Sequence, residues 1–421
     1  MGNILAFPKR SPPSLFEKRS PPENLFDLPF DVQCKILSGL PLKYLVQFSC
    51  ASKQARELID DPIFIRAHLK LINSLTDSRR VLILWWDPNL CRLKQCSLSS
   101  LLCAPTTETV DINYPPFKNP FTGVRVVGCC NGLVCIVFDG TKIILWNPST
   151  RKSKIVPDLG IRVEEDKGLP VVTYLIFSWG FGYDKIEDDH KVVAVAYEAD
   201  QGAATAMDGE VPKVKVKVKV YSTKKGIWKR IGDFQGGYPP LGVDGTFVNG
   251  KLHWSLEAEA GGDIVSLDLT TETYGRIEKP EQMKKPEIKC DEDSESLFEP
   301  VLEVYQEKLC LLCSVDNGHT DVWMMEIYGV TESWKMQFAI LINNPGGISR
   351  PLCRSEDGEV LVSTGTKSVR YNPDNAAYVD IPFRDQNIEV YHAFPYTQSL
   401  VLPYSKEEKD AIEQRRRRRM L

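Results

Sequence analysis

A hairpin pattern that recurs six times between residues 86 and 381 constrains the fold of this chain more than any other feature. Each copy combines an apolar strand end, a polar turn and a second strand. The equivalent points of the six copies are Asp87, Asn147, Ser222, Asp268, Tyr328 and Asn372. The steps between these points are 60, 75, 46, 60 and 44 residues. A repeat of this length predicts an architecture built from one supersecondary unit used many times.

A second hairpin precedes several of the copies. Its turns are expected at Asn131-Gly132, Asn249-Gly250, Glu307-Lys308 and Asp357-Gly358. Asn-Gly and Asp-Gly suit the positive φ angles of tight hairpin turns. Two hairpins per unit mean four strands per unit, and such units at about 50 residues are typical of β-propeller blades. The prediction is a mainly β domain over residues 75–403 with about six four-stranded blades. Two stacked sheets are the alternative, but they generate no internal period.

The segment from Ile388 to Pro403 is expected to supply the strand that closes the ring with an early blade, because closure removes exposed sheet edges. Another segment, from Val214 to Val220, alternates valine with lysine, so Lys215, Lys217 and Lys219 share one face of a strand. We interpret these lysines, with Lys213, as a solvated face or an edge that discourages strand addition. A basic stripe that binds an acidic ligand is the alternative.

Residues 25–70 show helical rather than strand periodicity. Val32, Ile36, Leu37 and Leu40 recur at the spacing of one helix face, and Pro29 suits the first turn of that helix. Pro41 is expected to end it and open a second helix, and two more short helices follow, the last from Ile63 to Leu69. A unit of this size buries little surface, so a partner or a neighbouring domain is expected to cover its remaining apolar face.

Composition excludes several classes of function. The net charge of -4 gives no overall attraction to nucleic acid or anionic lipid, so nucleic acid is not an expected partner. The longest strongly apolar run, Val81 to Trp86, is too short to span a membrane, which favours the cytoplasm or the nucleus. The 12 cysteines, including the Cys310 and Cys313 pair, are expected to be reduced and mostly buried.

No catalytic or metal-binding spacing stands out. The 5 histidines are scattered, and the chain has no motif for a nucleophilic serine, a phosphate-binding loop or a dinucleotide fold. We therefore predict no catalytic residue, no metal and no cofactor. A propeller enzyme with residues gathered from distant positions is the alternative. Aromatic residues near the blade turns are interpreted as packing residues rather than as contact residues for a ligand, namely Trp85, Trp86, Trp179, Tyr183, Trp254 and Trp323.

The remaining segments are polar. Residues 1–24 contain a duplicated KRSPP and are predicted to be disordered, as is the acidic insertion from Glu278 to Glu299. The small residues between Tyr197 and Pro212 predict an inserted loop. Residues 404–421 form a charged tail that is a helix candidate and ends in Arg415–Arg419. This arginine run is a nuclear import signal, a nucleic-acid contact or a solvated terminus, and no interleaved aromatic residues support the second interpretation.

The helical unit resembles the F-box, which docks substrate receptors on the Skp-type adaptor of cullin ubiquitin ligases. The matching positions are Leu28-Pro29, Ile36-Leu37, Leu40-Pro41, Leu45, Ser52-Lys53, Leu58-Ile59, Pro62, Phe64 and His68-Leu69. The resemblance implies contacts with the adaptor, and through it with cullin and RING subunits, by Leu28, Pro29, Ile36, Leu40, Pro41 and Leu45. Lys35 replaces the acidic residue of the family pattern and Ala55 its tryptophan, and we expect both to weaken adaptor binding. A helical hairpin that only caps the next domain is the alternative.

The β region is similar to the plant F-box-associated domain, sometimes described as kelch-like. The landmarks are GCCNGLVCI (128–136), LWNPSTRKSK (145–154), FGYDKIEDDHKVVAV (181–195), FVNGKLHW (247–254) and IVSLDLTTETY (264–274). Together the two resemblances imply a non-catalytic, substrate-recognition subunit of an SCF-type ubiquitin ligase. Its propeller would bind a protein target through positions that the sequence does not identify. An interaction scaffold without a ligase is the alternative.

Overall fold

A computed structural model describes most of the chain: residues 24–73, 78–87, 90–112, 124–138, 140–160, 174–199, 215–232, 244–256, 263–284, 300–315, 319–344, 347–384 and 392–420. It divides into two compact units, Met1–Ala67 and His68–Leu421. Residues 1–23 of the predicted leader, residues 200–211 of the predicted loop and residues 285–299 of the predicted acidic insertion lie outside the described residues.

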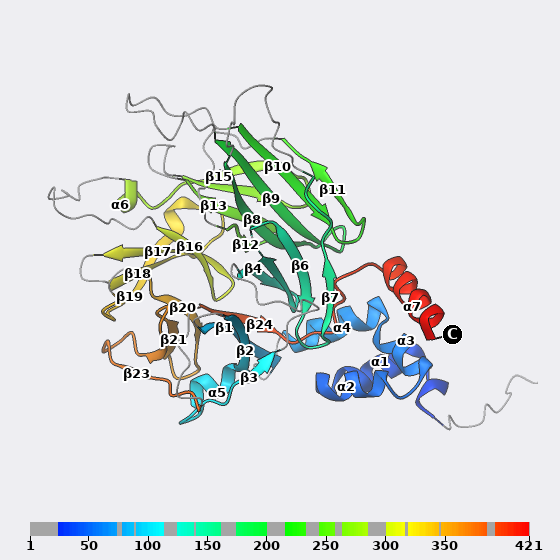
Figure 1. Ribbon diagram of the computed structural model, residues 1–421. Helices are drawn as coiled ribbons and strands as arrows, with labels where there is room; N and C mark the ends of the chain where they lie inside the picture. Colours follow the sequence, from blue (N-terminus) through cyan, green and yellow to red (C-terminus); the bar gives the residue numbers. More distant parts are fainter. Residues whose placement is uncertain are drawn as a thin grey trace, which may run out of the picture. The chain divides into compact units, whose positions relative to one another are not determined.

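The first unit is helical, as the periodicity predicts. It contains η1 (Leu25–Asp27), α1 (Phe30–Ser38), α2 (Leu42–Ser49), α3 (Lys53–Ile59) and the start of α4 (Pro62–Ile72) (Figure 1). Pro29 and Pro41 each stand at the N-cap, one residue before their helix, rather than inside the first turn. Ser52 caps α3, because its side chain accepts a hydrogen bond of 3.0 Å from the N–H of Ala55.

The second unit is a six-bladed propeller of antiparallel four-stranded sheets. The first sheet contains β24 (His392–Thr397), β1 (Arg79–Asp87), β2 (Leu90–Ser97) and β3 (Val110–Ile112). The second contains β4 (Val124–Cys130), β5 (Leu133–Phe138), β6 (Lys142–Asn147) and β7 (Lys152–Ile155). The third contains β8 (Tyr174–Asp184), β9 (Asp189–Ala199), β10 (Lys215–Ser222) and β11 (Ile227–Arg230).

The other three sheets follow in chain order. The fourth contains β12 (Thr246–Val248), β13 (Lys251–Ser255), β14 (Ile264–Asp268) and β15 (Tyr274–Ile277). The fifth contains β16 (Val301–Tyr305), β17 (Lys308–Val315), β18 (His319–Met325) and β19 (Trp334–Ile340). The sixth contains β20 (Arg350–Arg354), β21 (Val360–Ser363), β22 (Ser368–Tyr371) and β23 (Tyr378–Asp380). Between or after the strands lie α5 (Leu98–Cys103), α6 (Glu281–Lys284), η6 (Thr331–Ser333) and α7 (Lys406–Met420).

The ring is closed by the C-terminal strand, which confirms the sequence prediction. β24 pairs with β1 in antiparallel register, from Arg79 opposite Thr397 to Leu84 opposite His392 (Figure 1). The first strands of the sheets contact one another in a closed cycle, β4 to β8, β12, β16, β20, β24 and back to β4. These six strands therefore surround the ring axis, and the fourth strand of each sheet lies at the rim.

The closing strand also corrects the alignment of the repeats. Asn147, Ser222 and Asp268 end the third strand of their sheets, Asn372 follows the third strand directly, and Tyr328 lies three residues after it. Asp87 instead ends the second strand of the first sheet, because that sheet takes its first strand from the far end of the chain. The step of 60 residues from Asp87 to Asn147 is therefore not a true repeat length.

The two Asn-Gly turns have the predicted backbone conformation, whereas at Asp357-Gly358 only Gly358, at 91°, has a positive φ angle. Asn131 and Gly132 have φ angles of 53° and 80°, and Asn249 and Gly250 have 51° and 77°. A side chain at Gly132 would collide with Ser399, whose Oγ lies 2.2 Å from the ideal Cβ position. The turn predicted at Glu307-Lys308 lies one residue earlier, since Lys308 already begins β17.

Both chain connections of the ring lie at one of its ends. Because neighbouring strands are antiparallel, the turns between first and second strands and between third and fourth strands share this end, which we call the short-turn end. Arg79, where the chain enters the ring, pairs with Thr397, where the closing strand ends. Entry and exit are therefore both at the short-turn end, and the connections from one sheet to the next lie at the opposite end.

Apolar clusters between neighbouring sheets form the core. Leu82 of β1 belongs to one cluster with Trp146 of β6, and Val193 of β9 to another with Trp254 of β13. Trp179 and Trp254 are fully buried, which confirms that they are packing residues. All cysteines among the described residues that can be assessed are free thiols, and burial raises the pKa of Cys310 and Cys313 to about 12.

Aromatic donors repeat at the rim and explain part of the hairpin pattern. Trp228 of β11 donates its indole N–H to the carbonyl of Pro157, just after β7, at 2.8 Å. Tyr274 of β15 and Trp334 of β19 donate in the same way to the carbonyls that follow the fourth strand of the preceding sheet, Gly232 at 2.8 Å and Glu278 at 3.0 Å. These three aromatic residues, each after a polar turn, therefore join their sheet to the previous one.

The lysines of β10 do not protect a sheet edge, which corrects one of the sequence interpretations. β10 pairs with β9 on one side and β11 on the other. Lys219 donates to the carbonyl of Leu159 at 2.7 Å and so joins the third sheet to the segment that leaves the second. Lys213 lies outside the described residues.

Candidate functional site

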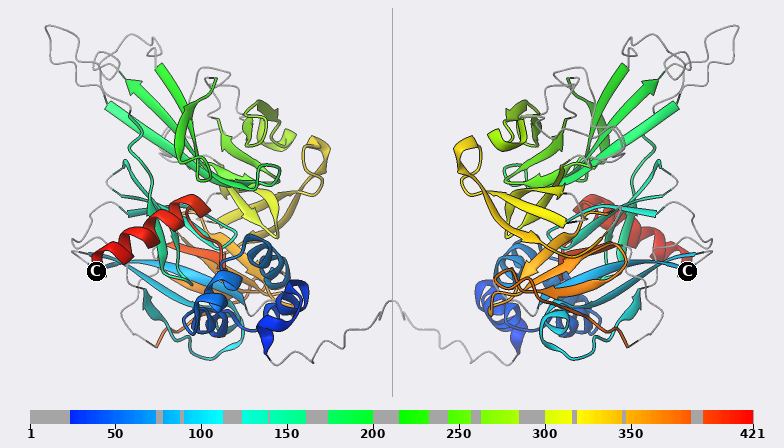
Figure 2. Two further views of the ribbon diagram at one scale, coloured as in Figure 1. Left: turned by 90° about the vertical axis from the view of Figure 1, so that its right-hand side faces the viewer. Right: turned by 90° about the vertical axis from the view of Figure 1, so that its left-hand side faces the viewer.

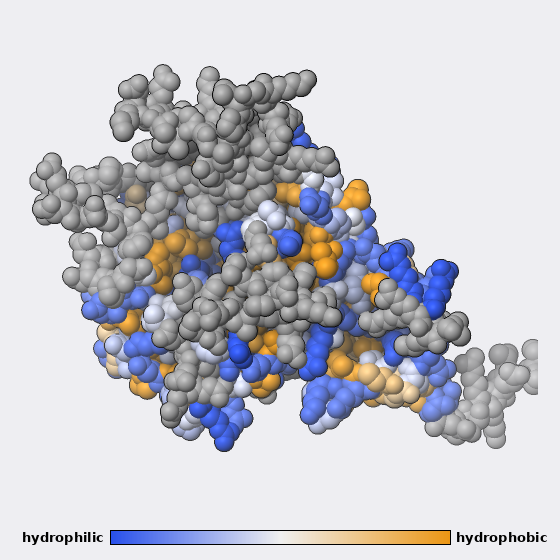
Figure 3. Space-filling model, in the orientation of Figure 1, coloured by the Kyte–Doolittle hydropathy of each residue, from blue (hydrophilic) through white to orange (hydrophobic). Residues whose placement is uncertain are grey.

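The helical unit exposes apolar side chains that an ordinary surface would not carry together. Val32, Ile36 and Leu40 are 36%, 51% and 39% exposed and follow one another at four-residue intervals, the spacing of one helix face. Leu40 stays in line because Gly39 keeps a helical backbone and the N–H of Leu40 bonds to the carbonyl of Leu37 at 2.9 Å. We call these three residues the exposed apolar row; Figure 3 shows hydrophobic residues at the surface over this unit.

The inward face of α1 consists of different residues. Gln33 and Leu37, four residues apart, are 9% and 4% exposed. The amide of Gln33 donates to the carbonyl of Leu28 at 2.7 Å and so fixes the segment that leads into α1. The prediction that Leu37 shares a face with the exposed apolar row is therefore wrong, since the buried pair and the row lie on different sides of the helix.

The structure distributes the six residues predicted to contact an adaptor over three environments. Pro29, Ile36, Leu40 and Pro41 are exposed, and Leu28 is half-buried. Leu45 is 0% exposed and belongs to the core of the helical unit, so its predicted contact is corrected to a packing role. Phe30 and Tyr44, which the prediction did not include, are 39% and 55% exposed.

The two departures from the family pattern also differ in environment. Ala55 is 0% exposed, so the missing tryptophan changes the packing of the unit rather than its surface. Lys35 is exposed beside Ile36 and adds a positive charge next to the exposed apolar row. Lys35 therefore changes the charge of the surface, whereas Ala55 changes the volume that fills the core of the helical unit.

The exposed apolar row suits contact with another protein. Covering what remains exposed of Val32, Ile36 and Leu40 is worth on the order of 1 kcal/mol for each side chain. Contiguous exposed apolar residues on a soluble domain typically mark an interaction surface.

No helix among the described residues is both long and apolar enough to cross a bilayer.

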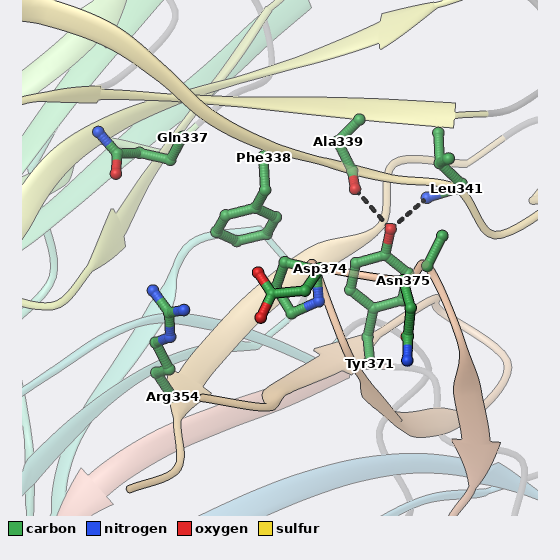
Figure 4. A pocket seen from close by; sticks show the side chains of 10 residues that line it. Gln337, Phe338, Ala339, Leu341, Arg354, Tyr371, Asp374 and Asn375 are labelled. Atoms are coloured by element: carbon green, nitrogen blue, oxygen red, sulfur yellow. Dashed lines mark hydrogen bonds between the residues drawn. The ribbon is translucent and has the colours of Figure 1, made fainter. Parts of the chain in front are cut away.

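The propeller contains a shallow cavity of about 460 Å³ beside β19. Its wall includes Tyr371, whose hydroxyl donates to the carbonyl of Ala339 at 2.7 Å and accepts from the N–H of Leu341 at 3.3 Å (Figure 4). Tyr371 thus satisfies backbone groups at the outer edge of β19. Arg354, also in the wall, donates to the carbonyl of Gly358 at 3.1 Å. Tyr371 therefore joins the sixth sheet to the fifth, whereas the bond of Arg354 lies within the first hairpin of the sixth sheet.

Buried charged groups in the propeller also serve structure. Lys191 donates to Asp184 at 2.8 Å and to the carbonyl of Leu269 in the fourth sheet at 2.6 Å. Burial opposes the charge of Asp184, but hydrogen bonds from Lys191, Thr270 and two backbone N–H groups outweigh it and lower its pKa. This ion pair stabilises the contact between the third and fourth sheets.

Two of the histidines, His190 and His253, are buried in the propeller. Burial lowers the pKa of His190 and of His253 to about 4. His253 bonds to the carbonyl of Thr246 at 3.0 Å and to the hydroxyl of Tyr328 at 2.7 Å. Within the described ranges, no three side chains of His, Cys, Asp or Glu come together as metal ligands would.

Comparison with known proteins matches both units. Residues 92–345, more than half of the chain, match the model of the F-box associated beta propeller domain, and residues 25–67 match the F-box domain. The F-box/kelch-repeat protein At3g23880 of Arabidopsis thaliana is 27% identical over 84% of this chain and 89% of its own length. The F-box protein CPR1 of the same plant is 28% identical over 85% of each chain. The chain therefore belongs to the plant F-box proteins that carry an F-box-associated β-propeller domain.

Proposed function

We propose that this protein is the substrate receptor of an SCF-type ubiquitin ligase and that its helical unit docks on a Skp-type adaptor. The exposed apolar row carries the proposal, because a small helical unit that leaves Val32, Ile36 and Leu40 in solvent gains stability when a partner covers them. Pro29 and Pro41, at the two N-caps, frame the same surface. The adaptor in turn connects the protein to cullin and RING subunits.

The propeller holds the protein target in this proposal and performs no chemistry. Its neighbouring sheets are joined by hydrogen bonds such as those of Trp228 and Lys191, and such a rigid frame suits recognition of a protein surface. Tethering the target in this way raises the effective concentration of its lysines near the ubiquitin-carrying enzyme.

Co-purification with a Skp-type adaptor tests the proposal. Leu28→Ala together with Pro29→Ala is expected to abolish it, because the change alters the segment that Gln33 fixes at the start of α1. The matched control is Ile186→Ala on the ring, where an isoleucine that is 80% exposed lies in a turn of the third sheet. Adaptor binding retained by the double variant, or lost equally in the control, contradicts the docking assignment.

A further inference from the structure

The C-terminal helix α7 is joined to the ring by an acidic side chain of its first turn. Glu408 and Ser405 form a reciprocal cap, in which the N–H of Ser405 donates to Glu408 Oε2 at 3.0 Å and the N–H of Glu408 donates to Ser405 Oγ at 3.3 Å. Both oxygens of the same carboxylate lie 2.7 Å from Lys154 Nζ on β7. The cap therefore orients the carboxylate, and the carboxylate ties the start of the helix to the ring (Figure 2).

Lys154 lies where the second and third sheets meet and is almost buried. Its side chain is 10% exposed, and its ammonium lies 5.3 Å from the centre of the ring of Tyr221, which is fully buried on β10. Gly226, in the turn before β11, lies against the other side of the carboxylate, since its ideal Cβ position is 3.6 Å from Glu408 Oε1. We call Lys154, Tyr221 and Gly226 the carboxylate site.

The carboxylate site requires a negative charge. Within the described part of the chain, Glu408 supplies the one carboxylate that pairs with Lys154. An almost buried ammonium without a partner is unfavourable, because burial removes its hydration and nothing replaces it. The ammonium does not distinguish a carboxylate of this chain from a carboxylate of another protein, so an acidic side chain from either source satisfies the site.

The later part of α7 adds little buried surface to this attachment. From Asp410 onward, each side chain that the structure describes is exposed, namely Asp410, Ala411, Ile412, Gln414, Arg415 and Arg418. Helices in proteins gain most of their stability from packing, and this part of α7 gains little of it. Exchange of Glu408 for another carboxylate therefore keeps the ion pair with Lys154 and releases a helix that loses little buried surface.

We propose that the carboxylate site binds an acidic segment of the protein target and that α7 occupies the site as an internal competitor. This proposal rests on the role of the propeller in the function proposed above. A glutamate or aspartate of the target pairs with Lys154, displaces Glu408 and releases α7. Arg415 and Arg418, which are exposed on α7, attract acidic segments toward this side of the ring. A neutral segment does not replace the ion pair, so the competition selects acidic targets.

The test measures binding of a fluorescein-labelled peptide with the sequence of residues 402–414 to the full chain by anisotropy. Glu408→Ala in the chain vacates the carboxylate site. We expect this variant to bind the peptide about tenfold more tightly than the unmodified chain, in which tethering gives α7 a high effective concentration. Glu407→Ala is the matched control, because it removes the same charge from the same turn and keeps the pair with Lys154. Its affinity should equal that of the unmodified chain.

Lys154 is tested in the chain that carries Glu408→Ala. Adding Lys154→Met keeps an apolar stem and removes the charge, so we expect peptide affinity to fall about tenfold. Lys154→Gln repeats the test with a polar side chain, and the melting temperature of each variant establishes that it is folded. In the unmodified chain, a high concentration of the peptide should raise the amide hydrogen exchange of residues 409–414, because α7 leaves the ring.

Unlabelled polyglutamate at constant ionic strength tests the class of ligand. It should displace the labelled peptide from the Glu408→Ala chain, whereas an unlabelled peptide with Glu408→Gln should not. The proposal is overturned if the Glu408→Ala chain binds the peptide no better than the unmodified chain does, or if binding survives the loss of Lys154. Failure of polyglutamate to displace the peptide also overturns it and reserves the site for α7. These mixtures contain no adaptor, so a failure here is distinct from a failure of adaptor docking.

Discussion

The helical unit and the propeller treat their apolar residues in opposite ways. Every residue of β5, from Leu133 to Phe138, is buried, because its sheet packs against a neighbour on each face. In the helical unit, Ile36 stays 51% exposed although Leu37 beside it is 4% exposed. A closed ring completes its own core, whereas a few short helices do not. The comparison teaches that, in the function proposed above, the exposed apolar surface of the small unit is the part of this molecule left for a partner to cover.

Removal of the closing strand should have the largest effect, because it opens the ring that completes the propeller core. A chain that ends after residue 391 lacks β24 and leaves the edge of β1 unpaired from Arg79 to Leu84. It also removes Tyr396, which is 4% exposed and packs in the cluster that contains Trp146. Because these losses exceed the roughly 5 to 15 kcal/mol that stabilise a domain, we expect no cooperative thermal transition by circular dichroism.

A chain that ends after Tyr404 is the matched control, since it keeps β24 and lacks only α7. Its melting temperature should stay within a few degrees of the full chain. A cooperative transition in the chain that ends after residue 391 would show that the ring does not depend on its closing strand.

A single buried amide offers a smaller way to weaken the closure. Asn147 donates to the carbonyls of Ser399 and Val401 at 2.9 and 2.8 Å, and it accepts from two backbone N–H groups of its own turn. Asn147→Ala leaves these buried groups unpaired, at a cost of about 4 kcal/mol in the free energy of unfolding by chemical denaturation. Asn375→Ala, at an exposed turn of the sixth sheet, should cost below about 1 kcal/mol. Equal costs would refute the special role of Asn147.

Acid should weaken the propeller through its buried histidines. The folded forms of His190 and His253 have pKa values of about 4, so the unfolded chain, with an ordinary value near 6.5, binds protons first as pH falls. Burial raises the pKa of Asp244 to about 6, so this group binds its proton first in the folded state and partly offsets the loss of stability. The free energy of unfolding is therefore expected to fall by roughly 3 kcal/mol between pH 7 and pH 5.

Chemical denaturation at the two pH values measures this loss. His253→Gln removes one of the titrating groups and should reduce the pH-dependent part by about 2 kcal/mol, whatever the variant costs at pH 7. An unchanged difference between pH 7 and pH 5 in the variant would exclude His253 as a source.

Neighbouring residues of α1 give the smallest effect and the sharpest contrast. Leu37→Ala removes a buried side chain and should lower the stability of the helical unit by about 2 to 3 kcal/mol. Ile36→Ala changes an exposed side chain and should cost below about 0.5 kcal/mol. Urea unfolding followed by far-ultraviolet circular dichroism distinguishes the two. Equal costs would mean that Ile36 is part of the core, and the unit would then lack its free apolar face.

Periodicity made much of the propeller predictable. The polar turns that follow Asn147 and Asp268 recur because each of these side chains accepts hydrogen bonds from the backbone N–H groups two and three residues later. The equivalence of Asp87 failed, because the strand that completes the first sheet lies about 300 residues away in the chain and changes the order within that sheet alone. Local pattern shows a hairpin, but it does not show which strand of a sheet the hairpin provides.

The helical unit shows a second limit of sequence reasoning. Spacing places Val32, Ile36 and Leu37 close together around a helix, but it does not show which of them face the core. In the structure Gln33 and Leu37 are the buried pair, and the amide of Gln33 donates to the carbonyl of Leu28. Leu45 matches a position of the binding motif and Ala55 departs from it, and both are fully buried, since a motif also includes residues that shape a surface from beneath.

The most direct measurement of the central claim is the affinity of the full chain for a purified Skp-type adaptor, by isothermal titration calorimetry. Ile36→Glu places a carboxylate in the exposed apolar row and should weaken binding at least a hundredfold while the melting temperature is unchanged. Ile186→Glu on the ring should bind as the unmodified chain does. Undiminished adaptor affinity in Ile36→Glu would contradict the claim that this exposed face docks the ligase.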